Sequence, residues 1–379
     1  MAERRLTVLQ ILPALESGGV ERGTLEVAAA LVAAGHRSLV VSAGGRLVEA
    51  LTAAGSEHIT LPVGRKSLAT LLQVRPLRRL MREQGVDILH ARSRLPAWVA
   101  WLAWRGLPAA GRPRFITTVH GLYSVNRYSA IMIRGERVIA VSDTVRNYLL
   151  DNYPAVDPQC IVTIYRGVDR AEFPYGYRPD ADWLDAWYGQ YPLLKGRRVL
   201  TLPGRLTRLK GHEDFIGLIA ALVAQGHDVH GLIVGHLDPG RQSYIKELQQ
   251  LVADRGVTAR ITFTGQRRDI REVYAFSDIV LSLSNKPESF GRTVLEALSL
   301  GVPVIGYAHG GVGEILDALY PVGKVARGDT SGLLERTAQL LKTPSAVPPG
   351  NAYTLDDMLD RTLDLYRQLA RVGAGSGTP

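Results

Sequence analysis

The sequence predicts an α/β protein with two domains of similar size, each built around a parallel β-sheet. The chain has 379 residues, which is more than one ordinary hydrophobic core accommodates. Short β-rich runs alternate with helical patterns along its length, which is typical of parallel strands joined by helices. A segment rich in Pro, Gly and Tyr, residues 173–180, separates the two halves. We therefore expect domains at residues 1–175 and 176–353, followed by an amphipathic helix at about 354–370.

The individual elements follow from the same alternation. An Ala- and Leu-rich run at residues 23–34 ends at Gly35, which is typical of a helix closed by a glycine. A further helix is expected to begin at His212, and another spans residues 293–299. The expected strands are residues 6–12, 38–43, 58–63, 87–90, 115–120, 138–142 and 161–165 in the first half, and 198–202, 231–234, 260–264, 278–284 and 303–307 in the second.

Composition is typical of a soluble globular protein. Hydrophobic residues make up 46% of the chain and charged residues 21%. No run reaches the roughly 18 apolar residues that a membrane-spanning helix needs. The single cysteine, Cys160, cannot form an internal disulfide, which fits a reducing compartment. We expect a cytoplasmic protein.

The positive charge is concentrated in the first half. Residues 1–180 hold 23 Lys/Arg and 15 Asp/Glu, a net charge of +8, whereas residues 181–379 hold 22 and 21, a net charge of +1. This asymmetry indicates an anionic partner, which could be a phosphorylated acceptor, an anionic membrane face or nucleic acid. No helix-turn-helix, zinc-finger or RNA-binding signature accompanies it, so we expect no nucleic-acid partner.

Two carboxylates lie eight positions apart in Glu288-Ser-Phe-Gly-Arg-Thr-Val-Leu-Glu296, after an expected strand. Open α/β sheets bind ligands at the carboxyl ends of their strands. The loop that enters the helix offers backbone N–H groups and the positive end of the helix dipole to an anion. Glu296, in the first turn of that helix, can accept two hydrogen bonds from a diol. A site that binds both a phosphate and a sugar diol is suited to a nucleotide. The alternative interpretation is an ordinary loop with two solvated glutamates, which would have the same sequence.

The loop Thr201-Leu-Pro-Gly-Arg-Leu-Thr-Arg-Leu-Lys-Gly-His212 carries cations to the start of another expected helix. Arg205 can bind phosphate oxygens as a bidentate fork, and Lys210 can bind them as a point charge. A solvated basic loop is the alternative. Because the loop belongs to the same half as Glu288 and Glu296, we expect it to bind a diphosphate.

Three features of the chain are more ambiguous. The paired Gly18 and Gly19 after the first strand permit close backbone approach to a ligand, but their spacing is not the dinucleotide-binding fingerprint. His120 ends a strand and either contacts a ligand or only hydrogen-bonds the backbone. The spelling Asp180-Ala-Asp182 matches the metal-binding motif of some sugar transferases, yet a helix N-cap explains Asp180 better. We expect no metal site.

These segments together resemble the family-4 retaining glycosyltransferases, which have the GT-B fold of two Rossmann-like domains facing across a cleft. The resemblance covers most of the chain and is strongest at residues 201–316, which include Gly310-Gly-Val-Gly-Glu-Ile315. The segments 138–142 and 165–169 also look like interdomain pieces of the family. The resemblance implies that the second domain holds a nucleotide-sugar donor, that the first binds the acceptor, and that the last helix crosses back to the first domain.

The resemblance also implies a role for each matching residue. Arg205 and Lys210 would neutralise the diphosphate, Glu288 and His120 would contact the donor sugar, and Glu296 would hold the ribose hydroxyls. No protein nucleophile and no cofactor are implied. Arg292 departs from the small residue common in the family, and we expect it to touch an acidic donor or acceptor. The remaining donor-binding residues carried over are Gly18, Gly19, Gly204, Gly265, Gln266, Arg267, Ser289, Phe290, Gly291 and Thr293.

The acceptor is less specified than the donor. Arg75, Arg78, Arg79 and Arg82 fall near one face of an expected helix, and residues 95–104 place Trp98, Trp101 and Trp104 at three-residue spacing. These tryptophans either fill the core or form, with the arginines, a surface that docks on an anionic membrane. The membrane interpretation would suit a UDP-sugar-dependent enzyme of lipopolysaccharide or other cell-surface glycan assembly. A soluble sugar-phosphate or storage-glycan synthase and a nucleotide-sugar 2-epimerase are the alternatives.

Overall fold

The computed structural model describes residues 4–16, 18–236 and 242–374, and it divides the chain into two units. The first unit comprises Met1–Arg166 with Asp356–Pro379, and the second comprises Gly167–Leu355. The expected boundary after residue 175 therefore lies nine residues too late. The cause is a close backbone approach: Val168 forms a parallel bridge with Thr354, and a Cβ at Gly167 would lie 2.0 Å from the Thr354 carbonyl oxygen.

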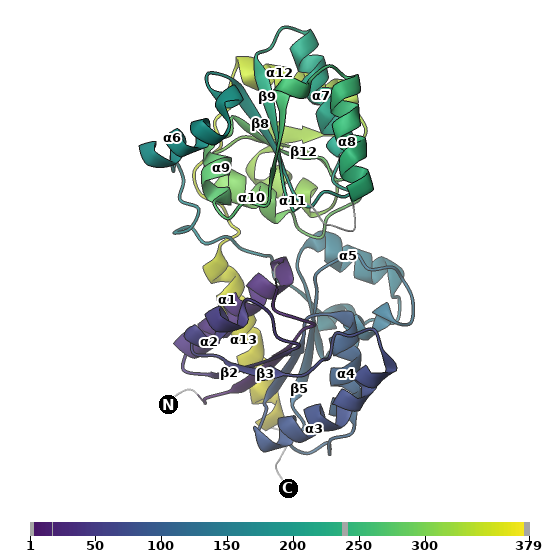
Figure 1. Cartoon of the computed structure of the whole chain (residues 1–379). Coiled ribbons are helices and arrows are strands. Elements are labelled where there is room, and N and C mark those ends of the chain that lie inside the picture. The colour runs from purple at the N-terminus through teal and green to yellow at the C-terminus, as the bar shows by residue number, and fades with distance from the viewer. Residues whose placement is uncertain (1–3, 17, 237–241, 375–379) are drawn as a thin grey trace. The chain divides into compact units, whose positions relative to one another are not determined.

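The first unit contains a seven-stranded, all-parallel sheet with the order β3-β2-β1-β4-β5-β6-β7. Figure 1 labels β2, β3 and β5 of this sheet. The strands β1, β4 and β5 are buried along nearly their whole length, as expected for parallel strands covered on both faces. All seven were predicted. The strands are β1 Thr7–Ile11, β2 Arg37–Ser42, β3 Glu57–Thr60, β4 Ile88–Ala91, β5 Arg114–Val119, β6 Arg137–Ala140 and β7 Ile161–Thr163.

The second unit contains a six-stranded parallel sheet with the order β10-β9-β8-β11-β12-β13. Five strands were predicted, whereas the two-residue β13 at its edge is too short to leave a pattern in the sequence. The strands are β8 Arg198–Pro203, β9 Val229–Val234, β10 Ile261–Gly265, β11 Ile279–Ser282, β12 Val304–Tyr307 and β13 Lys324–Val325.

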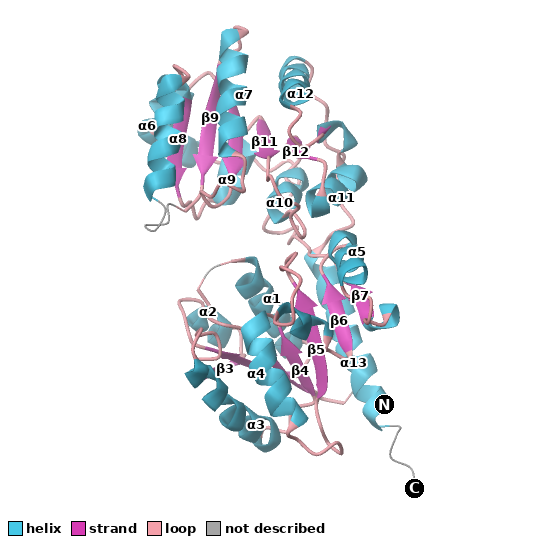
Figure 2. Ribbon diagram, turned by 90° about the vertical axis from the view of Figure 1, so that its right-hand side faces the viewer, coloured by secondary structure: helices cyan, strands magenta, loops and turns pink. Residues whose placement is uncertain are grey.

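Helices connect the strands in both units, as Figure 2 shows in ribbon form. The first helix begins four residues before its expected start, because Gly18 enters it as N-cap with a φ of 143°. The described part of the chain contains no helix with the length and apolar character needed to cross a membrane. The helices are α1 Gly19–Ala33, α2 Val48–Ala53, α3 Val74–Glu83, α4 Arg94–Arg105, α5 Asp143–Asn152, α6 Ala181–Gln190, α7 His212–Ala224, α8 Gln242–Asp254, α9 Ile270–Phe276, α10 Arg292–Ser299, α11 Gly310–Leu319, α12 Thr330–Lys342 and α13 Leu355–Ala374.

The predicted return of the last helix to the first unit is confirmed. From Asp356 onward α13 belongs to that unit, and its Tyr366 is fully buried there. The Tyr366 hydroxyl lies 2.6 Å from His90 Nδ1 on β4, and His90 Nε2 lies 2.6 Å from the Thr118 hydroxyl on β5. A buried chain of hydrogen bonds thus joins the end of the sequence to the sheet.

The strand order marks where each unit can bind a ligand. The chain reverses its winding direction between β1 and β4 in the first sheet and between β8 and β11 in the second. Ligands of open α/β sheets bind outside the carboxyl ends of strands at such a switch point. The loops that follow β8 and β11 are the two segments in which the sequence placed Lys210 and Glu288.

Candidate active site

The loop after β8 brings Lys210 to the switch point of the second unit. Gly204 has a φ of 140°, and a Cβ there would come within 3.4 Å of the Lys210 side chain. Gly211 is the left-handed N-cap of α7, and a Cβ there would lie 2.0 Å from the Leu283 carbonyl oxygen. The two glycines therefore let the loop close tightly against the end of β11. Arg205, in the same loop, has an exposed side chain.

Glu288 meets Lys210 across these two loops. The Lys210 ammonium donates to Glu288 Oε1 at 2.7 Å, with 27% and 23% of the two side chains exposed. The Ser284 hydroxyl donates to the same carboxylate oxygen. Burial alone would raise the pKa of Glu288, but the charge of Lys210 and these hydrogen bonds, with the charge of His309, bring that pKa below its ordinary value. Glu288 is therefore an ionised partner of Lys210.

The backbone around Glu288 is fixed by the start of α11. Glu288 bridges Gly310, and its carbonyl oxygen accepts from the Gly311 N–H at 2.8 Å. His309 Nε2 lies 2.7 Å from the Ser284 carbonyl oxygen. A Cβ at Gly311 would come within 2.4 Å of Phe290 backbone atoms. The glycine-rich segment 310–313 therefore lets α11 pack closely onto the Glu288 loop, because its glycines have no side chains.

The start of α10 carries the second carboxylate. Gly291 is its N-cap with a φ of 106°, and the helix begins at Arg292, one residue earlier than expected. Phe290 is buried against Tyr353 with ring centroids 6.0 Å apart. Glu296 is consequently the fifth helical residue and begins the second turn of the helix. Its side chain is 8% exposed, which places the carboxylate just under the surface of the site.

Arg292 is paired within its own helix. Its Nε donates to Glu296 Oε1 at 3.0 Å, one turn along α10. The predicted contact of Arg292 with an acidic donor or acceptor thus competes with an existing ion pair. Tyr274 of α9 also lies against Glu296: burial, followed by the negative charge of Glu296, raises the pKa of Tyr274 well above its ordinary value. Tyr274 is a neutral hydrogen-bonding neighbour that the sequence did not indicate.

The predicted residues at the end of β10 and just after it, Gly265 to Arg267, divide into two kinds. Gly265 has a φ of 71°, and Gln266 is exposed. Arg267, in contrast, forms two hydrogen bonds with Asp269, at 2.8 and 2.6 Å, and its guanidinium lies 5.0 Å from the Trp187 ring centroid. Trp183 donates to the same Asp269 at 2.8 Å. Arg267 therefore connects α6 to α9, and this structural role accounts for its contacts.

The first unit holds the other predicted residues at its own switch point. Gly18 and Gly19 follow β1, and His120 follows β5. His120 Nδ1 lies 2.8 Å from Arg166 Nη2. Burial, followed by the charges of Arg166, Arg92 and His90, lowers the pKa of His120 well below its ordinary value. The neighbouring cation was not assigned a role from the sequence, because 46 residues separate Arg166 from His120.

Asp180 of the Asp180-Ala-Asp182 motif has an ordinary structural role. The Asp180 side chain accepts from the Trp183 N–H at 2.8 Å and caps α6, as the N-cap interpretation predicted. Within residues 4–16, 18–236 and 242–374, no cluster of three or more His, Cys, Asp or Glu side chains is arranged to hold a metal ion.

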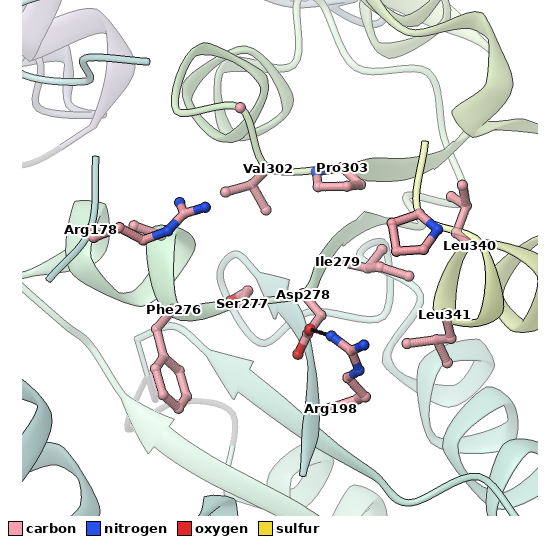
Figure 3. A pocket seen from close by; sticks show the side chains of 13 residues that line it. Arg178, Arg198, Phe276, Ser277, Asp278, Ile279, Val302, Pro303, Leu340 and Leu341 are labelled. Atoms are coloured by element: carbon pink, nitrogen blue, oxygen red, sulfur yellow. Dashed lines mark hydrogen bonds and ion pairs between the residues drawn. The ribbon is translucent and has the colours of Figure 1, made fainter. Parts of the chain in front are cut away.

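A cavity of about 310 Å³ in the second unit is separate from these groups (Figure 3). It lies at the amino ends of the strands, where β8 begins at Arg198 and Asp278 directly precedes β11. Arg198 and Asp278 pair at 2.6 Å, and Asp278 also accepts from the Val199 N–H at 2.7 Å. This pair fixes the amino ends of two neighbouring strands, so the cavity is not part of the candidate active site.

The three tryptophans of α4 pack against the hydrophobic core of the first unit. Trp98 donates to the Tyr128 carbonyl oxygen at 2.9 Å, and Trp104 donates to the Pro113 carbonyl oxygen at 2.7 Å. Guanidinium groups cover the third ring: Arg105 lies 4.7 Å and Arg134 5.0 Å from the Trp101 centroid. The core interpretation of these tryptophans is therefore the one that the structure supports.

Comparison with known proteins agrees with this geometry. Residues 17–172 match the family described as Glycosyltransferase Family 4, and residues 186–345 match Glycosyl transferases group 1. An N-acetyl-alpha-D-glucosaminyl L-malate synthase of Bacillus anthracis is 29% identical over 272 residues, which cover 69% of this chain and 67% of the relative. A D-inositol 3-phosphate glycosyltransferase of Rhodococcus opacus is 29% identical over 60% of this chain and 53% of its own length. The chain thus spans about half to two thirds of these curated relatives.

Solved structures share the fold. A glycosyltransferase from Rickettsia africae superposes with a TM-score of 0.84 at 29% identity, covering 96% of this chain and 98% of the other. Anabaena Alr3699/HepE, solved in complex with UDP-glucose, gives a TM-score of 0.77 at 20% identity, covering 98% of this chain and all of the other. The second comparison shows the fold alone. The chain belongs to the family-4 glycosyltransferases of the GT-B fold.

Proposed function

We propose that this chain is a retaining glycosyltransferase that uses a UDP-sugar and acts, without a metal ion, on a glycan or glycolipid acceptor in the assembly of a bacterial cell-surface glycan such as lipopolysaccharide. The observation that carries the proposal is the meeting of Lys210 and Glu288 at 2.7 Å beside the start of α10. A cation, an ionised carboxylate and a helix N-terminus at one switch point suit a sugar diphosphate.

In the proposed reaction the bond between the anomeric carbon and the diphosphate oxygen breaks, and a bond forms from the acceptor hydroxyl to the same face of that carbon. Negative charge grows on the leaving diphosphate, and Lys210, Arg205 and the N–H groups at the start of α10 stabilise it. Glu288 contacts the sugar hydroxyls and Glu296 contacts the ribose. A phosphate oxygen takes the acceptor's proton, so no protein nucleophile is needed. The family resemblance implies that Gly18, Gly19 and His120 also serve the donor.

A donor panel tests this proposal. Calorimetry with UDP, GDP and ADP, followed by their glucose and N-acetylglucosamine conjugates where these exist, should show the tightest binding for the UDP compounds. UDP is proposed because the Anabaena protein, which shares this fold, was solved in complex with UDP-glucose. Preference for GDP or ADP would overturn the choice of base, and binding of none of the three would overturn the donor site itself.

A small anionic acceptor is a second candidate. The named substrates of two curated relatives, L-malate and D-inositol 3-phosphate, are anionic, and the first half of this chain carries a net charge of +8. Such an acceptor would make the enzyme independent of membranes. The two candidates therefore differ in whether the protein associates with lipid.

The structure revises the membrane surface that the sequence predicted. Arg78 donates to the carbonyl oxygens of Ala103 and Leu102 at the end of α4, at 3.2 and 3.3 Å, so it is engaged inside the unit. Arg79 pairs with Glu83. Arg75 and Arg82 are the other two arginines of the predicted face, and both are exposed on α3.

Exposed leucines directly precede α3. The short 3₁₀ helix η1, Leu68–Gln73, leaves Leu68 87% exposed and Leu72 71% exposed. Exposed apolar side chains that precede a helix bearing exposed arginines are the combination that inserts into an interface while its cations face anionic headgroups, and here the cations are Arg75 and Arg82. We define these four residues as the η1 patch and propose that it binds an anionic membrane.

Vesicle co-sedimentation tests the η1 patch. At low salt the protein should pellet with vesicles of phosphatidylglycerol and phosphatidylethanolamine but not with phosphatidylcholine, and high salt should release it. Replacing both arginines by Gln should weaken binding by roughly thirtyfold, at about 1 kcal/mol per cation. Leu68→Ser with Leu72→Ser should abolish it, whereas Leu193→Ser, a matched exposed leucine of the second unit, should not. Wild-type protein that stays in the supernatant would overturn the membrane proposal and favour the small anionic acceptor.

A further inference from the structure

Arg166 approaches His120 with a specific geometry in the first unit. Its Nη2 lies 2.8 Å from His120 Nδ1, and its Nη1 lies 3.6 Å from Met358 Sδ on α13. A guanidinium carries only donors, so the hydrogen bond requires a lone pair on Nδ1. A neutral imidazole that accepts at Nδ1 carries its proton on Nε2.

The fold makes room for this guanidinium. Gly23 lies in α1 and is buried, and a Cβ at that position would come within 2.3 Å of Arg166 Nη1. Arg166 therefore lies between α1, the end of β5 and α13, and a larger residue at position 23 would displace it. The glycine in the middle of a helix, which costs about 1 kcal/mol relative to alanine, has its reason in this contact.

The surroundings keep the His120 ring neutral. His120 is partly buried, and the groups that act on it are Arg166, Arg92 on the segment after β4, and His90 on β4. Arg92 is itself buried and donates to Gln10 Oε1 at 2.6 Å. Two guanidinium groups disfavour a third positive charge, so the imidazolium form is suppressed and the tautomer decides what His120 can do.

We propose that Arg166 is a positioning residue that holds His120 as the Nε2-protonated tautomer, so that the ring offers a hydrogen-bond donor to the donor sugar and cannot serve as a general base. Nδ1 is occupied by Arg166, and Nε2 carries the proton. The part of this inference that concerns the sugar rests on the proposed function. The tautomer itself depends only on the geometry of the first unit.

Long-range proton–nitrogen NMR of protein with ¹⁵N-labelled histidine side chains tests the tautomer directly. Wild-type His120, assigned by loss of its signals in His120→Gln, should show an unprotonated Nδ1 and a protonated Nε2. Arg166→Met should shift the Nδ1 resonance toward a mixture of tautomers. Arg361→Met, which removes an arginine that donates to the Thr163 carbonyl oxygen, is the matched control and should leave His120 unchanged.

A second variant displaces Arg166 without removing it. Gly23→Ala should shift the His120 resonances in the same direction as Arg166→Met, whereas Gly217→Ala in α7, where a Cβ meets nothing within 4 Å, should not. In the transferase assay Arg166→Met should lower kcat by about tenfold with little change in KM, the loss expected for one weakened hydrogen bond, and Arg166→Lys, which keeps a donor, should recover part of it.

The two levels of the inference fail separately. An Nδ1-protonated His120 in the wild type, or the same tautomer in Arg166→Met, would overturn the positioning role whatever the enzyme's activity. The predicted tautomer together with unchanged kcat in Arg166→Met would overturn the contact with the donor sugar. Absence of any sugar transfer by the wild type would overturn the proposed function and leave the tautomer result standing.

Discussion

Replacing Glu288 by Gln should strengthen the binding of a nucleoside diphosphate while it lowers sugar transfer. In the ligand-free protein the Lys210 ammonium donates to Glu288 Oε1 at 2.7 Å. A phosphate oxygen that accepts from the same ammonium would lie within about 5.5 Å of that carboxylate. The nucleoside diphosphate has no sugar for Glu288 to hold, so it meets only the repulsion between the two anions.

The size of this effect follows from Coulomb's law. Two unit charges at about 5.5 Å repel by about 0.8 kcal/mol at the dielectric constant of water and by about 3 kcal/mol at an effective value of 20. About a quarter of each side chain of the ion pair is exposed, which places the site between these limits. Glu288→Gln should therefore bind UDP at least about fourfold more tightly. Lys210→Met should bind it roughly 10- to 150-fold more weakly, through loss of a charged hydrogen bond of about 1.5–3 kcal/mol.

Isothermal titration calorimetry of the two single variants and the double variant forms a complete cycle. Lys324 and Asp317 supply the control, since they form an ion pair of the same type elsewhere in the second unit, and Lys324→Met with Asp317→Asn should leave UDP binding unchanged. Weaker binding of UDP by Glu288→Gln would refute the reasoning, because it would mean that Glu288 supports the diphosphate site instead of opposing it.

Three further results are expected. Glu296→Gln should weaken UDP binding by roughly 10-fold or more, through loss of charged hydrogen bonds to the ribose diol, and unchanged affinity in calorimetry would place the ribose elsewhere. Turnover should persist in excess EDTA, since Lys210, Arg205 and the helix dipole supply the positive charge; activity that disappears and returns with Mn²⁺ would contradict this. Finally, the pKa of Glu288 lies below its ordinary value of 4.5. The free energy of unfolding of the wild type should therefore exceed that of Glu288→Gln by a constant amount above about pH 5.5, and this difference should decline as the pH falls through the folded-state pKa. Chemical denaturation at several pH values measures the difference, and a difference that grows toward low pH would contradict the ion pair.

The fold was predictable because its signals are local. Alternating strands and helices located twelve of the thirteen strands in the described part of the chain, and β13 was missed because two residues are too few to show a periodic pattern. The loops of Lys210 and Glu288 could be assigned to one site because parallel strands present their carboxyl ends at one edge of the sheet. The domain boundary was placed too late because Val168 pairs with Thr354, a contact between segments 186 residues apart that no local pattern reveals.

Side-chain pairing was the part that the sequence could not supply. Arg292 was expected to face a ligand, yet it pairs with Glu296 on its own helix. Arg78 was assigned to a surface, yet its guanidinium donates to a backbone carbonyl oxygen at the end of α4. The last carbonyl groups of a helix have no partner within the helix, so they accept hydrogen bonds from a nearby guanidinium. Arg166 and His120 are 46 residues apart in the sequence and come into contact only in the folded protein. Each outcome depends on which partner is nearest in space, which spacing along the chain does not encode.

The stereochemistry of sugar release tests the central claim most directly. At high protein concentration water can replace the acceptor, and time-resolved proton NMR records the anomer of the first sugar released from an α-linked UDP-sugar before mutarotation. The account predicts that the α anomer appears first, with one equivalent of UDP, and that Lys210→Met slows this release by orders of magnitude. First appearance of the β anomer would contradict it.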